Sequence, residues 1–410
     1  MSYLLAIWLC MPSFLMVVFS FSSLAAGLIA TSFLAFLLTL LSNLKRSIRI
    51  GRPYLVILVT AVISVLLSRY LVQQPLSHKQ ALAMIGLAVL AFAAPTLLHH
   101  YFARNARDVS RELRWTFFAF VVIGLVGVFW PIRLGPFAAL NHPIFPFSEP
   151  SHFALAYSQV AALALFFFRR KGRLLVVTTS FLLAVGLPNT TMLMVALLLL
   201  FVTASFRFLM IFPLAAGAVI GLLLNFSPDS LAYFSDRLAS GENLSHLVYM
   251  QGWESLISAN LETNGIGIGF QNLGNEAPGV ATEIIRTLTN EIDLNREDGG
   301  FLLAKIVGEF GLLGLVATLF LLALAIWSGI RMRHELKFRL NTKRAIVLIP
   351  LGSVFISTVE ILVRGVGYFS PTFILTIYFI IPAVRVLTGT ASNSIIRGPS
   401  PQTPRIQPTA

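Results

Sequence analysis

The chain contains one cysteine in 410 residues and few charged residues of either sign. A single cysteine, Cys10, excludes an intrachain disulfide framework and any metal site built from several thiolates. Only 11% of the residues are charged and 57% are hydrophobic, which excludes a soluble fold for most of the chain. Acidic residues are especially scarce, at 17 against 30 Lys and Arg. The shortage of acids makes their positions informative.

Common catalytic signatures are also missing. The sequence has no P-loop, no Asp-x-Asp, no His-Glu-x-x-His and no Gly-x-Ser-x-Gly. These absences disfavour an ATPase, a soluble-type sugar-nucleotide transferase, a zinc protease and a serine hydrolase. We therefore expect no metal and no cofactor. No basic residue precedes Lys45, so the charged beginning of a cleaved signal peptide is missing, and we expect the first segment to remain as a transmembrane hairpin.

Long apolar runs occupy most of the chain. Each is roughly 17–22 residues long, enough for a helix to cross a hydrocarbon core of about 30 Å. The sequence therefore predicts an all-α polytopic membrane protein with about 12 transmembrane helices. The predicted spans lie near residues 4–19, 24–43, 54–72, 81–102, 115–130, 152–168, 174–187, 191–205, 208–225, 306–327, 345–363 and 372–390.

Lys and Arg gather in alternate short loops, at 45–52, 104–114, 169–173 and 331–344, and in the C-terminal tail. With twelve spans, twenty-two of the thirty basic residues fall on one side and fourteen of the seventeen acidic residues on the other. The positive-inside rule then places both termini in the cytoplasm. Short basic loops beside a membrane attract anionic lipid, so we expect no nucleic acid partner. The Ser-, Pro- and Thr-rich residues 391–410 are predicted to be a disordered cytoplasmic tail.

The predicted organisation is nine transmembrane helices in 1–225, a large outer loop at 226–300 and three more helices in 301–390. So long a connection usually carries structure and function. Apolar residues recur at helical spacing in 243–260 and 280–292, which predicts two helices within the loop. Between them, Gly265, Gly267 and Gly269 would let the backbone turn tightly and approach a ligand.

A shorter outer segment, 131–152, carries His142, Glu149 and His152 beside the sixth span. One interpretation is an ordinary helix start, with Ser148 as N-cap and Pro150 in the first turn. The alternative is functional, because ionisable groups at a membrane edge often belong to a site.

The end of the large loop places Asp298 just before the tenth span. Asp298 is a candidate carboxylate, or alternatively a helix cap. Lys305 and Glu309 follow at a spacing of four, which predicts an ordinary ion pair on one helix face. Gly308, Gly311 and Gly314 predict close helix packing.

Several arginines lie on the predicted outer side, where each alone is read as a surface residue. Together they would suit phosphate or pyrophosphate, whose oxygens match the guanidinium fork. They are Arg133, Arg237, Arg286, Arg296 and Arg364.

The order of these features resembles the Wzy-type O-antigen and exopolysaccharide polymerases, in the superfamily that also contains the O-antigen ligases. The resemblance rests on the Glu-Pro-Ser run at 149–151, an Arg near the start of the outer loop, the Asn-Gly-Ile-Gly-Ile-Gly turn at 264–269, and Glu-Phe-Gly-Leu-Leu-Gly at 309–314. It covers roughly residues 115–330. It implies a metal-independent membrane glycosyltransferase of the bacterial inner membrane, which transfers a growing glycan from undecaprenyl pyrophosphate to the next lipid-linked repeat unit on the periplasmic face.

The resemblance also suggests roles for residues. Arg237 would bind the pyrophosphate, supported by Arg133, Arg286 and Arg296. Glu149 is the first choice for catalytic base and Asp298 the second, with His246 and His152 weaker candidates. The three glycines at 265, 267 and 269, with His152, would line the donor pocket. A chain-length regulator and a flippase are the expected protein partners.

Other functions remain open at this point. O-antigen ligases of similar sequence carry a His just before the final Glu-x-Gly-Leu-Leu-Gly helix, where this chain has Asp298-Gly299-Gly300, so a ligase is less favoured. A polytopic transporter or flippase is the main alternative, although the chain shows no repeated halves. A structural membrane partner of a glycan-length regulator is the third.

Overall fold

The structure, a computed structural model, describes residues 3–21, 23–42, 51–73, 75–134, 143–205, 243–291 and 294–390. Within these residues the protein is helical, and the extended pairing is one isolated bridge between Ile144 and Phe147. Arg237, His142, the predicted span 208–225 and the predicted tail 391–410 lie outside the described residues.

The helices largely follow the predicted segments. They are α1 Leu4–Val18, α2 Leu24–Ser42, α3 Arg52–Leu71, α4 His78–Phe102, α5 Ala106–Phe129, α6 Pro150–Ala164, η2 Leu165–Phe167, α7 Arg170–Gly186, α8 Thr190–Thr203, α11 Leu244–Glu262, α12 Val280–Thr289, η3 Arg296–Asp298, α13 Leu302–Glu335, α14 Thr342–Ile356, α15 Thr358–Leu362 and α16 Pro371–Leu387. Six of the described helices are long and apolar enough to cross a membrane: α3, α4, α5, α6 with η2, α13, and α14 with α15. The protein is a helical membrane protein.

Each predicted apolar segment within the described residues contains a helix, and both helices predicted inside the large loop are confirmed as α11 and α12. Helix boundaries differ where polar turns extend a helix. For example, α5 begins at Ala106, well before the predicted 115, because the Asn105 side chain accepts a hydrogen bond from the Arg107 amide at 3.1 Å and caps the polar first turn.

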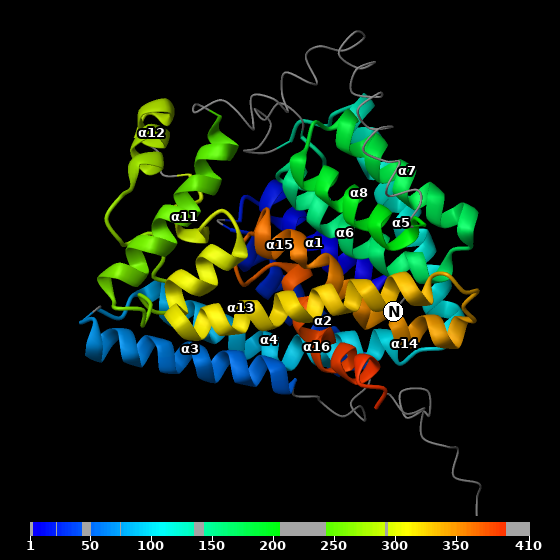
Figure 1. Cartoon of the computed structure of the whole chain (residues 1–410), viewed down its shortest axis with the longest axis horizontal. Helices are drawn as coiled ribbons and strands as arrows, with labels where there is room; N and C mark the ends of the chain where they lie inside the picture. The colour runs from blue at the N-terminus through cyan, green and yellow to red at the C-terminus, as the bar shows by residue number, and fades with distance from the viewer. Residues whose placement is uncertain are drawn as a thin grey trace, which may run out of the picture.

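The helices form two groups joined by α13. Figure 1 shows the group α5 to α8 at one end and α11 and α12 at the other, while α16 packs on α13, α3 and α4. α11 packs on the start of α13, and α12 packs on α11 through a small core of their own, formed by Leu247, Val248, Ala281 and Ile285. The two loop helices are therefore docked on the membrane bundle.

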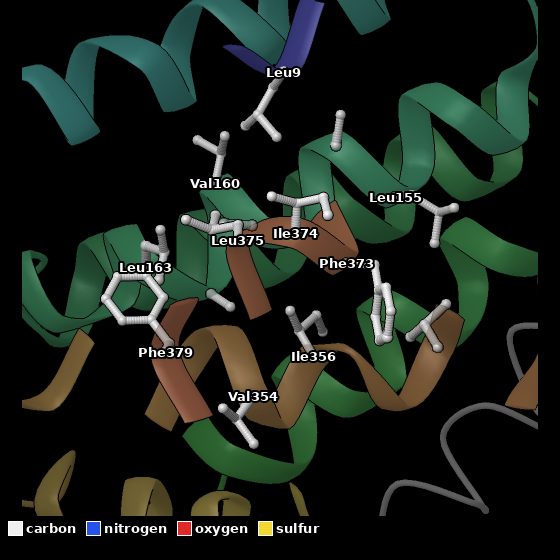
Figure 2. Close-up of a cluster of buried hydrophobic side chains, with 14 of the residues drawn as sticks. Leu9, Leu155, Val160, Leu163, Val354, Ile356, Phe373, Ile374, Leu375 and Phe379 are labelled. Atoms are coloured by element: carbon white, nitrogen blue, oxygen red, sulfur yellow. The ribbon is translucent and has the colours of Figure 1, made fainter. Parts of the chain in front are cut away.

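The main core lies where α1, α6, α14 and α16 meet. Figure 2 shows Leu9, Leu155, Val160, Ile356 and Ile374 converging there. Polar bonds fix α16 among its neighbours: Trp8 donates to the carbonyl of Pro371 at 3.2 Å, and Tyr54 donates to that of Ile374 at 2.7 Å. These bonds give two large amphipathic side chains a partner inside an apolar environment.

Helices on the outside of the bundle expose apolar side chains. The most hydrophobic stretch of α3 is 28% buried, as is that of α13, whereas that of α6 is 78% buried. On α13 the exposed residues include Leu312, Val316 and Phe320. Large exposed apolar faces on long helices are expected where lipid is the solvent.

α13 is interrupted near its start. Gly311 adopts φ 58° and ψ −136° inside an otherwise helical segment. The amide of the next residue, Leu312, donates to the carbonyl of Gly265 at 2.9 Å, so the loop before α12 supplies a partner at the break. A Cβ on Gly311 would lie 2.0 Å from that carbonyl oxygen. The loop that contains Gly265, Gly267 and Gly269, called the glycine loop, therefore packs backbone to backbone against the break in α13.

We predict that Gly311→Ala destabilises the protein by about 2–5 kcal/mol, because it adds left-handed strain to overpacking. The thermal midpoint of the purified protein in detergent measures the effect. Gly389→Ala is the matched control, since Gly389 has φ +73° and an added methyl group would meet no atom within 4 Å. Equal midpoints for the two variants would contradict the close packing.

Candidate functional site

Three segments that are far apart in the sequence meet at one end of the bundle: the start of α6, the turn before α13, and the link from α15 to α16. The Gly365 amide donates to the carbonyl of Gly300 at 3.0 Å. Arg364 in the same link forms an ion pair with Glu149 at 3.0 Å. A Cβ on Gly367 would lie 2.9 Å from Oδ1 of Asp298. We call this meeting point the junction site; it comprises Glu149, His152, Asp298, Lys305, Glu309, Arg364 and Tyr368.

Glu149 is held by several partners. Its Oε2 accepts from Arg364 Nη2 at 3.0 Å and from the Ser151 hydroxyl at 2.9 Å. Burial alone would raise the pKa of Glu149, but the charges of Arg364 and His152 and the two hydrogen bonds lower it to about 2. A carboxylate with so low a pKa is a weak proton acceptor. The geometry therefore suits Glu149 to holding Arg364 in place better than to acting as the base.

The start of α6 explains this geometry. Glu149 itself occupies the N-cap position in extended conformation, and Pro150 follows in the first turn. Pro150 was predicted there, but the prediction that Ser148 is the N-cap was wrong. The Ser148 hydroxyl instead lies 2.6 Å from Nδ1 of His152 and orients that ring. His152 interacts electrostatically with both Glu149 and Asp298, so the two predicted carboxylates belong to one site.

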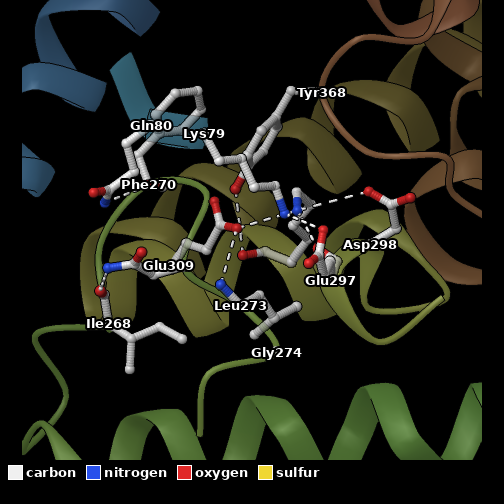
Figure 3. Close-up of polar contacts among 12 residues, drawn as sticks. Lys79, Gln80, Ile268, Phe270, Leu273, Gly274, Glu297, Asp298, Glu309 and Tyr368 are labelled. Carbon is white, nitrogen blue, oxygen red and sulfur yellow. Dashed lines mark hydrogen bonds and ion pairs between the residues drawn. The ribbon is translucent and has the colours of Figure 1, made fainter. Parts of the chain in front are cut away.

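Lys305 is a fully buried cation at the centre of the site. Its Nζ lies 3.2 Å from Oε1 of Glu309 and 3.8 Å from Oδ1 of Asp298, and it donates to the carbonyl of Glu297. It also lies 5.5 Å from the ring centroid of Tyr368. Figure 3 shows Glu309, Asp298, Glu297 and Tyr368 around this position. The predicted Lys305–Glu309 pair is confirmed, but both side chains are 0% exposed, so it is no ordinary surface pair.

Glu309 connects this cation to the glycine loop. Its Oε1 accepts from the Leu273 amide at 3.4 Å, while its Oε2 is buried with no hydrogen bond to a described residue. Its backbone carbonyl accepts from the Gly269 amide at 3.0 Å. Burying a charged pair is costly unless its remaining oxygens are bonded. The Glu309 carboxylate, which pairs with Lys305 and accepts one backbone hydrogen bond, therefore lies two residues before the break in α13 at Gly311.

The glycines of the loop have a packing role. Gly265, Gly267 and Gly269 have φ between +80° and +93°, and the loop runs along α13 with the Ile268 amide bonded to the carbonyl of Gly308 at 3.0 Å. A Cβ on Gly267 would lie 2.5 Å from the Glu309 carbonyl oxygen. The predicted close approach is made to the backbone of α13. No contact among the described residues supports the hypothesis that these glycines line a donor pocket.

Among the described residues, Arg133, Arg286 and Arg296 are not part of the junction site. Arg296 is buried, donates to the carbonyl of Glu276 and lies 3.9 Å from its carboxylate, so it stabilises the loop. Arg286 pairs with Glu283 on α12 at 3.1 Å. Arg133 is exposed and forms no ion pair with a described residue. The arginine at the site is Arg364, one of the five arginines that the sequence predicts on the outer side.

The remaining predictions fall nearby or elsewhere. Asp298 lies in η3 and its side chain is 49% exposed; it does not cap α13, whose N-cap is Phe301. His246 lies in the first turn of α11, and its side chain forms no hydrogen bond with the described residues of the junction site.

Other contacts at the site were not apparent in the sequence. Lys79 pairs with Glu297 at 2.5 Å, and Gln80 donates to the carbonyl of Phe270 at 2.9 Å. Both come from the start of α4, and nothing in the local pattern marks them, because their partners are about two hundred residues away. Burial raises the pKa of Tyr368, and the neighbouring charge of Glu309 raises it further, so this phenol stays protonated.

Across the described ranges, no three His, Cys, Asp or Glu side chains are grouped as a metal site would require. The chain matches no protein-family model, no curated protein and no solved structure.

We predict that Lys305→Met alone costs about 3–5 kcal/mol, because it leaves the Glu309 carboxylate buried without its cation. Lys305→Met with Glu309→Gln should recover most of that loss. Thermal midpoints of the two variants and of Glu309→Gln form a double-mutant cycle. Additive losses, with no recovery in the double variant, would contradict a coupled buried pair.

The Glu149 pair predicts a pH dependence. The pKa of Glu149 is lowered from 4.5 to about 2, so its stabilising contribution is complete above pH 4.5 and is lost as the pH falls toward 2. In Arg364→Gln the largest of the lowering influences is removed, so the pKa of Glu149 rises toward its unfolded value and stability should fall less between pH 4.5 and pH 3. Thermal midpoints measured from pH 7 to pH 3 compare the two proteins. Parallel curves would show that Arg364 does not control this carboxyl.

Proposed function

We propose that the protein is a membrane glycosyltransferase that polymerises lipid-linked oligosaccharide repeat units, as its resemblance to the Wzy-type polymerases implies. It would transfer the growing glycan from undecaprenyl pyrophosphate to the non-reducing end of the next lipid-linked unit. The proposal includes about twelve spans, both termini in the cytoplasm and the junction site on the periplasmic face of a bacterial inner membrane. The distribution of Lys and Arg among the loops supports this orientation.

The observation that carries the proposal is the convergence of Glu149, Asp298 and Arg364 from three distant segments onto one end of the bundle. Glycosyl transfer from a lipid pyrophosphate needs a cation for the leaving group and a carboxylate for the acceptor hydroxyl. The bond between the anomeric carbon and the phosphate oxygen breaks, and a bond to the acceptor oxygen forms. The hydroxyl proton moves to the carboxylate, and the pyrophosphate leaves as an anion.

The geometry suggests how the roles divide. Arg364 would contact the pyrophosphate, held in orientation by Glu149, because its guanidinium fork can use its remaining donors on phosphate oxygens. Asp298 is half-exposed and is the better candidate for the base. Lys305, whose Nζ lies 3.8 Å from Oδ1 of Asp298, adds positive charge to the site. Arg237, which lies outside the described residues, stays a candidate for the same pyrophosphate.

The proposed partners follow from the reaction. Undecaprenyl-pyrophosphate-linked oligosaccharides are both donor and acceptor, so the substrate arrives from the membrane. A flippase would deliver the repeat units to the outer leaflet, and a chain-length regulator would limit the product. No nucleic acid, metal or cofactor is part of the proposed reaction.

A transporter or flippase is the second candidate, and one feature of the structure favours it. α13 is broken at Gly311 beside the buried Lys305 and Glu309, and Glu360 in α15 is buried with the Thr372 hydroxyl bonded at 2.8 Å. Interrupted helices with buried ionisable groups are common where secondary transporters bind ions or substrates. The O-antigen ligase would differ from the polymerase in its acceptor, and the purely structural membrane partner would catalyse no reaction.

We predict that Arg364→Lys and Asp298→Asn each reduce polymer formation by about a hundredfold or more, because each removes a transition-state contact. The host gene is deleted and complemented with each variant, and the surface and lipid-linked glycans are separated on a gel. Arg111→Lys is the control, since Arg111 forms an exposed pair with Asp108 in another part of the chain. Membrane levels of each variant are compared by immunoblot.

The gel also separates the alternatives. A ladder that collapses to single repeats supports the polymerase. Long glycan left on undecaprenyl pyrophosphate with a bare core would instead indicate a ligase. Repeat units trapped on the cytoplasmic side would indicate a flippase. A normal ladder in both variants would reject the assigned site.

A further inference from the structure

A second feature lies among the basic loops, away from the junction site. A half-open cavity of about 1580 Å³ lies between the beginning of α5, the link from η2 into α7, the end of α8 and the link between α13 and α14. In Figure 1 the end of α13 lies toward the group α5 to α8, at the opposite end from α11 and α12. None of the residues of the junction site lines this cavity.

The charged residues that line the cavity are all basic. They are Arg114, Arg169, Arg170, Lys171, Arg173, Arg333, Lys337 and Arg339. Three of them are fixed by the protein itself: Arg114 donates to the carbonyl of Ser110 at 3.3 Å, Arg173 to that of Leu165 at 3.2 Å, and Arg333 to that of Phe201 at 2.9 Å. These bonds use backbone oxygens and leave the positive charge of all three side chains unneutralised.

The other basic side chains have no counter-charge among the described residues. Arg169, Arg170, Lys171, Lys337 and Arg339 are exposed and form no ion pair within those ranges. The neighbouring acid, Glu335, is already shared between Arg331 at 2.8 Å and Arg344 at 2.7 Å. Like charges gathered around one cavity raise the local positive potential, which favours an anion there.

The beginning of α7 adds to this imbalance. Its N-cap Arg169 makes no side-chain cap hydrogen bond, and its first turn carries Arg170, Lys171 and Arg173 with no acid. The positive end of the helix dipole disfavours cations at that place and favours anions, in particular phosphate. An anion bound at this turn would neutralise its uncompensated positive charge.

Much of the remaining lining is apolar. It includes Phe166, Phe168, Leu200, Val202, Phe338 and Leu340. A free phosphate or a nucleotide would gain little from these side chains, whereas an acyl chain would bury apolar surface against them. The cavity combines cations for a headgroup with an apolar wall for its tail.

We propose that this cavity binds an anionic phospholipid, with its phosphate between the first turn of α7 and the α13–α14 link and its acyl chain along the aromatic and aliphatic wall. Basic pockets between transmembrane helices suit acidic headgroups. The cavity would bind a lipid of the surrounding membrane, and this binding does not depend on the reaction proposed for the junction site.

The test compares two triple variants of the full chain that lose the same charge. The cavity variant is Arg170→Gln, Lys337→Gln and Arg339→Gln. The control variant is Arg107→Gln, Lys343→Gln and Arg385→Gln, whose side chains are exposed outside the cavity. Native mass spectrometry of the detergent-purified proteins measures binding of dioctanoyl phosphatidylglycerol and dioctanoyl phosphatidylcholine. Competition with inorganic phosphate distinguishes binding of the phosphate group alone from binding that also needs the acyl chains.

We expect wild type and control to bind phosphatidylglycerol alike and the cavity variant about a hundredfold more weakly, because each Lys or Arg beside an anionic headgroup contributes a factor of about five. Phosphatidylcholine should bind weakly to all three. Equal affinities of the two triple variants would overturn the proposal. So would equal binding of the two lipids, or displacement of phosphatidylglycerol by inorganic phosphate at the same concentration.

Discussion

The buried ion pair between Lys305 and Glu309 is the constraint on which this end of the molecule depends. Two opposite charges with 0% exposure are stable only if the surrounding structure supplies the lost hydration. The turn before α13 supplies a carbonyl to Lys305, and the glycine loop supplies an amide to Glu309. The break at Gly311 lets the loop lie against α13 at this depth. The Lys305–Glu309 pair, the glycine loop and the break at Gly311 therefore depend on one another.

This dependence also positions the groups of the candidate site. Lys305 draws Asp298 toward the link between α15 and α16, and the same link carries Arg364 to Glu149. Glu149, Asp298, Lys305, Glu309 and Arg364 thus each form an ion pair within the site. Preorganised charge of this kind is what stabilises a developing anion with little rearrangement.

The sequence was a good guide to the helices and a partial guide to the site. Apolar runs and helical spacing identified the described membrane helices and both α11 and α12, because these signals are local. Glu149, Asp298 and the Lys305–Glu309 pair were identified as single features. Their convergence was not, since the ion pair between Glu149 and Arg364 links residues 215 positions apart. The glycines were recognised as a close approach, but their partner, the broken backbone of α13, has no signature in a single sequence.

The burial of α6 has a consequence for how the protein is made. Of the six long apolar helices it has the lowest mean hydropathy, and its most hydrophobic stretch is 78% buried against other helices. A helix that faces protein gains little from entering lipid alone, and the insertion machinery favours segments that do. α6 is therefore expected to be retained in the membrane only after its neighbours, α14 and α16 among them, are present. Stable insertion of α6 would then depend on α14 and α16, which are synthesised after it.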